Sequence, residues 1–217
     1  NAELFWRQQH LLRMLVGLPW LGLLFTAPYL ASLVMMDSAW GFCQACGYSW
    51  SVFWYLLVPL IMTHGYSVCL VSAVILQKRL LIGRLGPGVV IGPPSGCSTS
   101  GDGVWARAHW ATFRRWLHER SVTSHAFDQA LDPLVNTELL SWVHRLLGAK
   151  VGRRVQSDNF QLVDHDCVEI EDFVVFGSEV QMNCDAAIPR EPARRQLRPI
   201  RLLRAANCLD RSLVMPD

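Results

Sequence analysis

Residues 14–36 read MLVGLPWLGLLFTAPYLASLVMM and contain no charged side chain. At a rise of about 1.5 Å per residue, this run forms a helix long enough to cross a hydrocarbon layer of about 30 Å. Residues 50–76, WSVFWYLLVPLIMTHGYSVCLVSAVIL, form a second uncharged run, with aromatic side chains gathered at its start as they are at membrane interfaces. The sequence therefore predicts a membrane α-helical hairpin of two transmembrane helices within residues 1–84.

The charged residues flanking these two runs predict how the hairpin is oriented. Arg7 and Arg13 precede the first run, and Lys78, Arg79 and Arg84 follow the second, whereas the connecting loop contains no Lys or Arg. Because basic residues stay on the inner side of a membrane, both termini are expected to face the cytosol, stroma or matrix.

Composition limits the class of protein. Apolar residues make up 51% of the chain and charged residues 18%, and almost all of the charges follow residue 76. The net charge of +2 predicts no nucleic-acid partner. Seven cysteines, an odd number, predict a reducing environment for the C-terminal part. Cys43 and Cys46 leave open a small disulfide or half a zinc site, beside the simpler interpretation of two free thiols.

His64 is the one histidine inside the second apolar run. A polar side chain at that depth is costly unless it has a partner, so His64 is a candidate cofactor ligand, for example for the magnesium of a chlorophyll or another pigment. The simpler interpretation is a neutral imidazole that is hydrogen-bonded within the helix bundle.

Residues 85–147 are expected to form a loop and amphipathic helices at the membrane surface. A Gly-, Pro- and Ser-rich loop covers residues 92–103, and a helix follows at residues 104–120, VWARAHWATFRRWLHER. This helix suits contact with membrane lipid, although packing against its own domain is equally open. The candidate lipid-contact residues are Trp105, Trp110, Arg114, Arg115 and Trp116. A further helix is expected at residues 137–147, with Gly148 as its C-cap.

After Gly148 the apolar residues recur at every sixth position. The units VGRRVQ, IEDFVV and FGSEVQ begin at Val151, Ile170 and Phe176, and weaker echoes begin at Leu202 and Cys208. Such hexapeptides are typical of a triangular coil of parallel strands. The sequence therefore predicts a small, degenerate left-handed parallel β-helix over residues 148–217.

Several of these segments together resemble a known family. KRLLIGRLGPG at residues 78–88, LLGAKVGRRVQ at 146–156, VEIEDFVVFGSEVQ at 168–181 and RPIRLLRAANCLDRSLVMP at 198–216 occur in that order. They resemble the membrane-bound C-terminal region of nonribosomal peptide synthetases of the poly-lysine-synthetase type. The resemblance implies membrane spans combined with hexapeptide domains, and an activity that joins or releases amino acids.

The chain also departs from that family's pattern. It contains no adenylation or carrier domain, and Glu171 and Leu203 stand where the repeat should have glycine. His165, in the sequence VDHDC, is the one histidine of the repeat region and the only candidate general base there. We expect it to be an ordinary surface or loop histidine, and we name no catalytic or metal-binding residue.

Charge is divided within the last part of the chain. Acidic residues dominate residues 157–185, whereas arginines crowd the stretch that follows. The two groups are expected to neutralise each other across the coil, or alternatively to form docking faces for neighbouring subunits. The candidate docking residues are Arg190, Arg194, Arg195 and Arg198.

These observations favour a non-catalytic accessory subunit that other membrane-protein subunits complete. A photosynthetic complex of the thylakoid is favoured over a respiratory complex of the mitochondrial inner membrane, with chlorophyll and lipid as the expected ligands. The alternative is a membrane-bound acyl- or peptidyl-transfer enzyme, or a fragment of one, related to the nonribosomal peptide synthetases.

Overall fold

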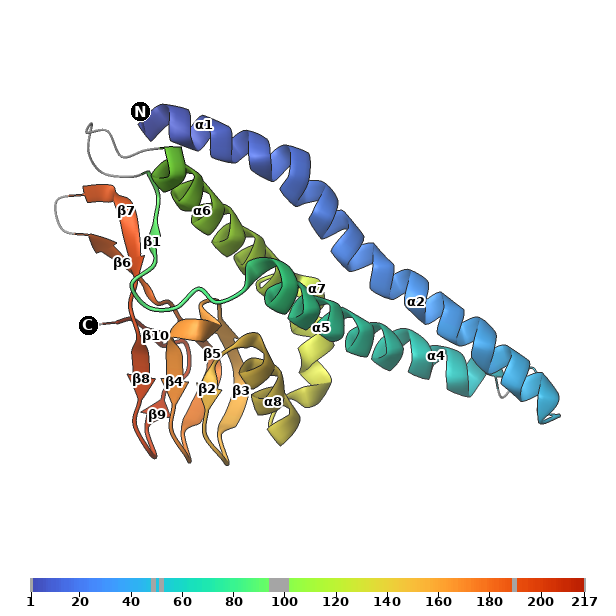
Figure 1. The fold of residues 1–217 in the computed structure, drawn as a ribbon. Helices are drawn as coiled ribbons and strands as arrows, with labels where there is room; N and C mark the ends of the chain where they lie inside the picture. Colours follow the sequence, from blue (N-terminus) through green and yellow to red (C-terminus); the bar gives the residue numbers. More distant parts are fainter. Residues whose placement is uncertain (1, 48–49, 51–52, 94–101, 189–190, 217) are drawn as a thin grey trace.

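A computed structural model describes residues 2–47, 50, 53–93, 102–188 and 191–216. Two long helices extend away from a group of short strands, and three further helices lie between the two parts (Figure 1). Of the predicted loop at residues 92–103, residues 94–101 lie outside the described part, as does Arg190.

The predicted helical hairpin is present. The first helix is continuous over 44 residues, through α1 (Ala2–Leu12), a π-helical turn η1 (Arg13–Gly17) and α2 (Leu18–Ala45). The second covers 30 residues and ends in α5 (Tyr66–Gln77) and the π-helical turn η4 (Lys78–Ile82). Its first half consists of η2 (Phe53–Leu57), α4 (Val58–Leu60) and η3 (Ile61–Gly65). Both helices are long and apolar enough to cross a membrane.

The two long helices pack on each other along a narrow apolar seam. Leu21 and Leu24 of α2 belong to the same buried cluster as Leu70, Val71 and Val74 of α5. The first helix extends beyond its uncharged run at both ends, to Ala2 and to Ala45, and the second extends beyond its run at the C-terminal end, to Ile82.

Three helices connect the hairpin to the strands. In α6 (Asp102–Val122), which runs beside α1, the backbone carbonyl of His109 accepts a hydrogen bond of 2.8 Å from the side chain of Gln9. A hydrogen bond to the Ser124 hydroxyl caps α7 (His125–Leu131), which packs on α5 and leads through the short turn η5 (Asp132–Leu134) to α8 (Glu138–Leu147). Helix α7 was not predicted, whereas α8 and its Gly148 cap lie where the sequence predicts them.

Parallel strands follow α8, in the region where the hexapeptides predict them. One sheet has the order β2 (Lys150–Val151), β4 (Val168–Ile170) and β8 (Ile200–Leu202). In the other, β5 (Val175–Met182) pairs with β3 (Gln156–Leu162), β9 (Asn207–Cys208) and β10 (Leu213–Val214). Every pairing in these two sheets is parallel. The pairings establish parallel sheets, and the left-handed winding stays a prediction.

A third sheet interrupts the repeat and was not predicted. Strands β6 (Asp185–Ile188) and β7 (Glu191–Leu197) pair in antiparallel fashion, and β1 (Val90–Ile91) adds to β7. Because β1 lies just after the hairpin, this sheet ties the membrane-proximal segment to the C-terminal part. The core of the strand region is apolar and contains Phe160, Ile170, Phe176, Val180 and Leu197.

Candidate functional site

The acidic turn between β3 and β4 is where the strand region meets the helices. Its sequence is Val163-Asp164-His165-Asp166-Cys167, and it includes the 3₁₀ turn η6 (His165–Cys167). The side chains of Asp164, His165 and Asp166 reach different partners on α6, α8 and η4. One short turn therefore joins three helices to the β sheets.

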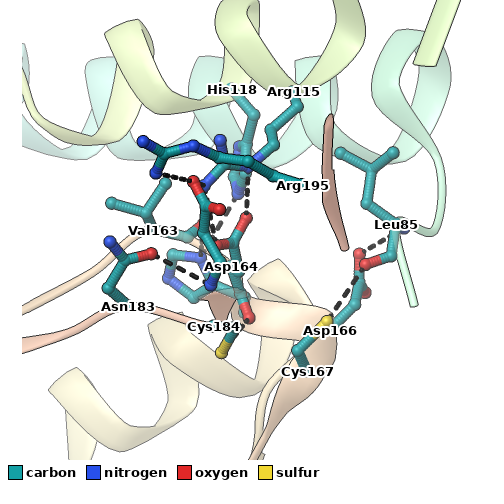
Figure 2. Close-up of polar contacts among 12 residues, drawn as sticks. Leu85, Arg115, His118, Val163, Asp164, Asp166, Cys167, Asn183, Cys184 and Arg195 are labelled. Carbon is teal, nitrogen blue, oxygen red and sulfur yellow. Dashed lines mark hydrogen bonds and ion pairs between the residues drawn. The ribbon is translucent and has the colours of Figure 1, made fainter. Parts of the chain in front are cut away.

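Asp164 and Arg115 of α6 form a bidentate ion pair (Figure 2). The Nε and Nη2 atoms of Arg115 each donate to one carboxylate oxygen of Asp164, and both distances are 3.1 Å. Asp185 lies 3.3 Å from the same guanidinium and is also paired with Arg195 at 3.1 Å. Burial alone would lower the pKa of Arg115, but the hydrogen bonds that it donates to Asp164 and the charges of Asp164, Asp185 and Glu119 raise it. The arginine is therefore held charged inside the protein.

Asp166 connects the acidic turn to the end of the second long helix through hydrogen bonds. Its Oδ2 atom accepts hydrogen bonds from Nζ of Lys78 and, at 2.7 Å, from the backbone N–H of Leu85. The Asp166 side chain also lies close to the C-terminal end of α8, because a Cβ atom added at Gly148 would lie 2.3 Å from Asp166 Oδ1. Gly148 also has φ of +118°, so glycine is required there for two reasons.

His165 lies between two other histidines. Its Nδ1 is 3.3 Å from Nε2 of His118 on α6, and its Nε2 is 3.2 Å from Nδ1 of His144 on α8. All three imidazoles are buried. Burial lowers the pKa of His144 to about 4, and it lowers the pKa of His118 and of His165 well below the usual value, with a further contribution from the Lys78 charge. The three rings are therefore neutral at physiological pH.

This arrangement suits a structural joint. His165 was expected at the surface, but it is 1% exposed, because the turn that carries it folds underneath α6 and α8. The expectation of a surface position is therefore wrong, whereas the expectation of a position in a loop or turn is correct. A general base must reach its substrate, and both ring nitrogens of His165 face other protein groups. Within the described ranges, no group of three or more His, Cys, Asp or Glu residues is placed to hold a metal ion.

His64 lies on the surface of the hairpin. It is exposed, and its Nδ1 forms a 2.8 Å hydrogen bond with the hydroxyl of its neighbour Thr63. It also lines a cavity between α5 and the helices α7 and α8. Pigment binding by His64 stays a prediction.

The five candidate lipid-contact residues of α6 differ in their surroundings. Trp110 is 48% exposed, whereas Trp105 and Trp116 are half-buried, against Phe5 and beneath Arg13 respectively. Arg114 is half-buried and donates to the backbone carbonyl of Arg84. For Arg115 the prediction is wrong, because its guanidinium turns inward to Asp164. Lipid contact through the other four residues stays a prediction.

The candidate docking arginines lie in and next to β7. Arg195 pairs with Asp185, which agrees with the predicted neutralisation of charge across the coil. Arg194 and Arg198 also have interaction partners within the protein. Ion pairs between Arg201 and Glu171, at 2.7 Å, and between Arg211 and Glu179, at 3.1 Å, continue this pattern. Docking of a partner by these arginines stays a prediction.

Sequence analysis singled out His165 but missed its two histidine partners. His144 follows Leu140 by four residues and precedes Leu147 by three, which places all three on one face of α8. His118 likewise precedes Val122 of α6 by four residues, and both side chains are buried. A histidine within an apolar helical stripe was thus the available signal, but its partner could be identified only in three dimensions.

Compared with known proteins, the chain matches no family model, no curated protein and no solved structure.

Proposed function

We propose that this chain is a non-catalytic accessory subunit of a larger integral-membrane assembly, either photosynthetic or respiratory. One observation carries the proposal: His64 and Thr63 present polar side chains on the outer surface of an apolar helix. Thr63 engages only Nδ1 of His64, and in hydrocarbon the second ring nitrogen would cost several kcal/mol if it had no partner. A neighbouring subunit or a bound pigment would remove that cost.

The hairpin leaves ample surface for such a neighbour. Only 17% of the most apolar stretch of each long helix is buried within the chain. At the far end of the hairpin, Trp40, Trp50, Phe53 and Trp54 form an aromatic group in which each ring centroid lies 4.4–6.0 Å from those of at least two others. Such a rigid aromatic group suits either a membrane interface or a protein contact.

We further propose that the strand region is a left-handed β-helix that serves as the subunit's scaffold. The same corner occurs twice: the N–H of Arg153 donates to Asp172, 19 residues later, and the N–H of Ser178 donates to Asp210, 32 residues later. The larger interval contains the β6–β7 hairpin as an insertion. A coil of about 18 residues with one insertion accounts for both intervals.

The rival function, acyl or peptidyl transfer, would use His165 or another, unidentified group as its base. That histidine is 1% exposed, which favours the accessory role. We propose an organellar location, with the thylakoid preferred and both termini on the stromal or matrix side.

Purification of the full chain in mild detergent tests the proposal. We expect stoichiometric recovery with other membrane subunits by native mass spectrometry, and loss of one chromophore per complex in His64→Leu if a pigment is bound. Thr26→Val is the matched control, because its hydroxyl bonds to the carbonyl of Gly22 in its own helix. Recovery of a free chain that transfers acyl or aminoacyl groups would contradict the accessory role.

A further inference from the structure

A cationic cavity of about 360 Å³ lies at the end of the second long helix, where η4 meets α8. Lys78, Arg79, Arg84 and Arg145 line it, together with one acid, Asp166. The Asp166 carboxylate is already engaged by Lys78. Nε and Nη2 of Arg145 donate to the uncharged carbonyls of Val151 and Gly152. The cavity therefore has a surplus of positive charge and suits an anion.

An apolar cavity of about 330 Å³ adjoins the cationic one, and Leu146 of α8 lines both. Its walls come from α5 on one side and from α8, with the end of α7, on the other. The apolar residues that face each other across it are Val68, Val71 and Ile75 of α5 and Leu139, Trp142 and Leu146 of α8.

Helix α8 has two apolar faces. Leu140, Val143 and Leu147 are buried in the core, as expected for an amphipathic helix. Leu139, by contrast, is 59% exposed, and Trp142, three residues further along the helix, is 58% exposed. A contiguous apolar face left open next to a membrane-spanning helix is typical of a binding surface.

The two cavities are arranged like the two parts of a phospholipid: the cationic cavity is placed for the phosphate of the headgroup, and the apolar cavity for an acyl chain. The cationic cavity lies beside Arg79 and Arg84, which follow the apolar stretch of α5, and the apolar cavity runs back along that helix from Ile75 to His64. Eleven residues of helix measure about 16 Å, close to the half-thickness of a hydrocarbon layer of about 30 Å. One acyl chain would reach that far from a headgroup at the interface.

We propose that this pair of cavities binds one anionic phospholipid. Arg79, Arg84 and Arg145 hold its phosphate, and one acyl chain lies between α5 and α8. The inference goes beyond the proposed accessory role, because the site is formed by this chain alone and needs no partner subunit.

The test uses the purified full chain in mild detergent, titrated with phosphatidylglycerol or phosphatidylcholine and analysed by native mass spectrometry. We expect one phosphatidylglycerol per chain, bound at least tenfold more tightly than phosphatidylcholine. The double variant Arg79→Gln/Arg84→Gln should lose about tenfold to thirtyfold of this affinity, since each basic side chain at a lipid surface contributes roughly a factor of five. The matched control is Arg107→Gln/Arg153→Gln, which removes the same charge at two exposed positions outside both cavities.

A second variant tests the acyl-chain half. Leu139→Gln places an amide in the apolar cavity at an exposed position, so the fold is retained, and it should weaken binding several-fold without changing the preference for the anionic headgroup. Inorganic phosphate at millimolar concentration distinguishes the two sources of a phosphate group. Displacement of the lipid by phosphate, or equal binding of the two lipids, would overturn the proposal.

Discussion

Asp164 and Arg115 are 49 residues apart in the chain, yet their side chains form two parallel hydrogen bonds of 3.1 Å in the interior. This pair connects the strand region to α6, the helix that runs beside α1. It lies next to a second connection, from Asp166 to Lys78, and to the row of three buried histidines. The acidic turn thus joins the two halves of the protein, in addition to the pairing of β1 with β7.

Replacing Arg115 with Met should destabilise this link by about 3 kcal/mol, because Asp164 would remain buried without its partner. The measurement is thermal unfolding in detergent, followed by the circular dichroism of the strands. Arg107→Met is the control, since Arg107 is exposed and bonds within its own helix to Gly103. A loss of stability no larger than that of the control would show that the pair does not hold the halves together.

Acid should weaken the same region. The pKa of His144 is lowered to about 4 in the folded protein, against about 6.5 in the unfolded chain. The unfolded chain therefore binds more protons in this interval, so stability is complete above pH 6.5 and falls as the pH drops towards 4. By pH 5 His144 alone should cost about 2 kcal/mol.

The variant His144→Phe checks this assignment, because it keeps a ring that can stack on Phe160 but cannot titrate. Its stability, measured by denaturation at pH 7 and pH 5, should depend less on pH than that of the wild type. An unchanged difference between the two pH values would assign the acid sensitivity to other groups.

Gly177→Ala should destabilise the strand region by about 2 kcal/mol. The added Cβ would lie 2.1 Å from Asp210 Oδ1 and 2.7 Å from the Asp210 backbone nitrogen, so the backbone of the turn between β9 and β10 would have to shift. Gly103→Ala is the control, because nothing lies within 4 Å of its added Cβ and alanine favours the helix. Equal unfolding temperatures for the two variants would argue against close stacking at this corner.

Cysteine labelling should report both burial and sidedness. Cys46, in the turn after α2, is an exposed free thiol, whereas Cys167 and Cys184 are buried free thiols. The pKa of the Cys184 thiol is raised, mainly by a hydrogen bond with Cys167 and secondly by burial. Little reactive thiolate therefore forms at Cys184. A membrane-impermeant maleimide should label Cys46 only when it is added on the side of the membrane opposite the termini. The labelling is measured separately for each cysteine-containing peptide. Labelling of Cys46 from the same side as the termini would contradict the proposed orientation.

Local patterns in the sequence were sufficient to predict several elements of the fold. The uncharged runs at residues 14–36 and 50–76 predict the two long helices, because excluding charge over bilayer length leaves few other structures. The hexapeptides predict parallel strands at Ile170 and Phe176, because side chains in a strand alternate between two faces over a short, regular interval. Gly148 marks the end of α8 through its freedom to adopt positive φ.

Only the tertiary structure determined what the charged and histidine side chains do. The spacing within residues 163–167 gives no indication that Asp164 meets Arg115, that Asp166 meets Lys78, or that His165 lies between His118 and His144. These partners come from elements far apart in the chain, and burial of the turn selects them, because each buried charge or imidazole needs a partner. The sequence by itself thus determined which segments form helices and strands, whereas the packing of those segments decided which polar groups are joined inside the protein.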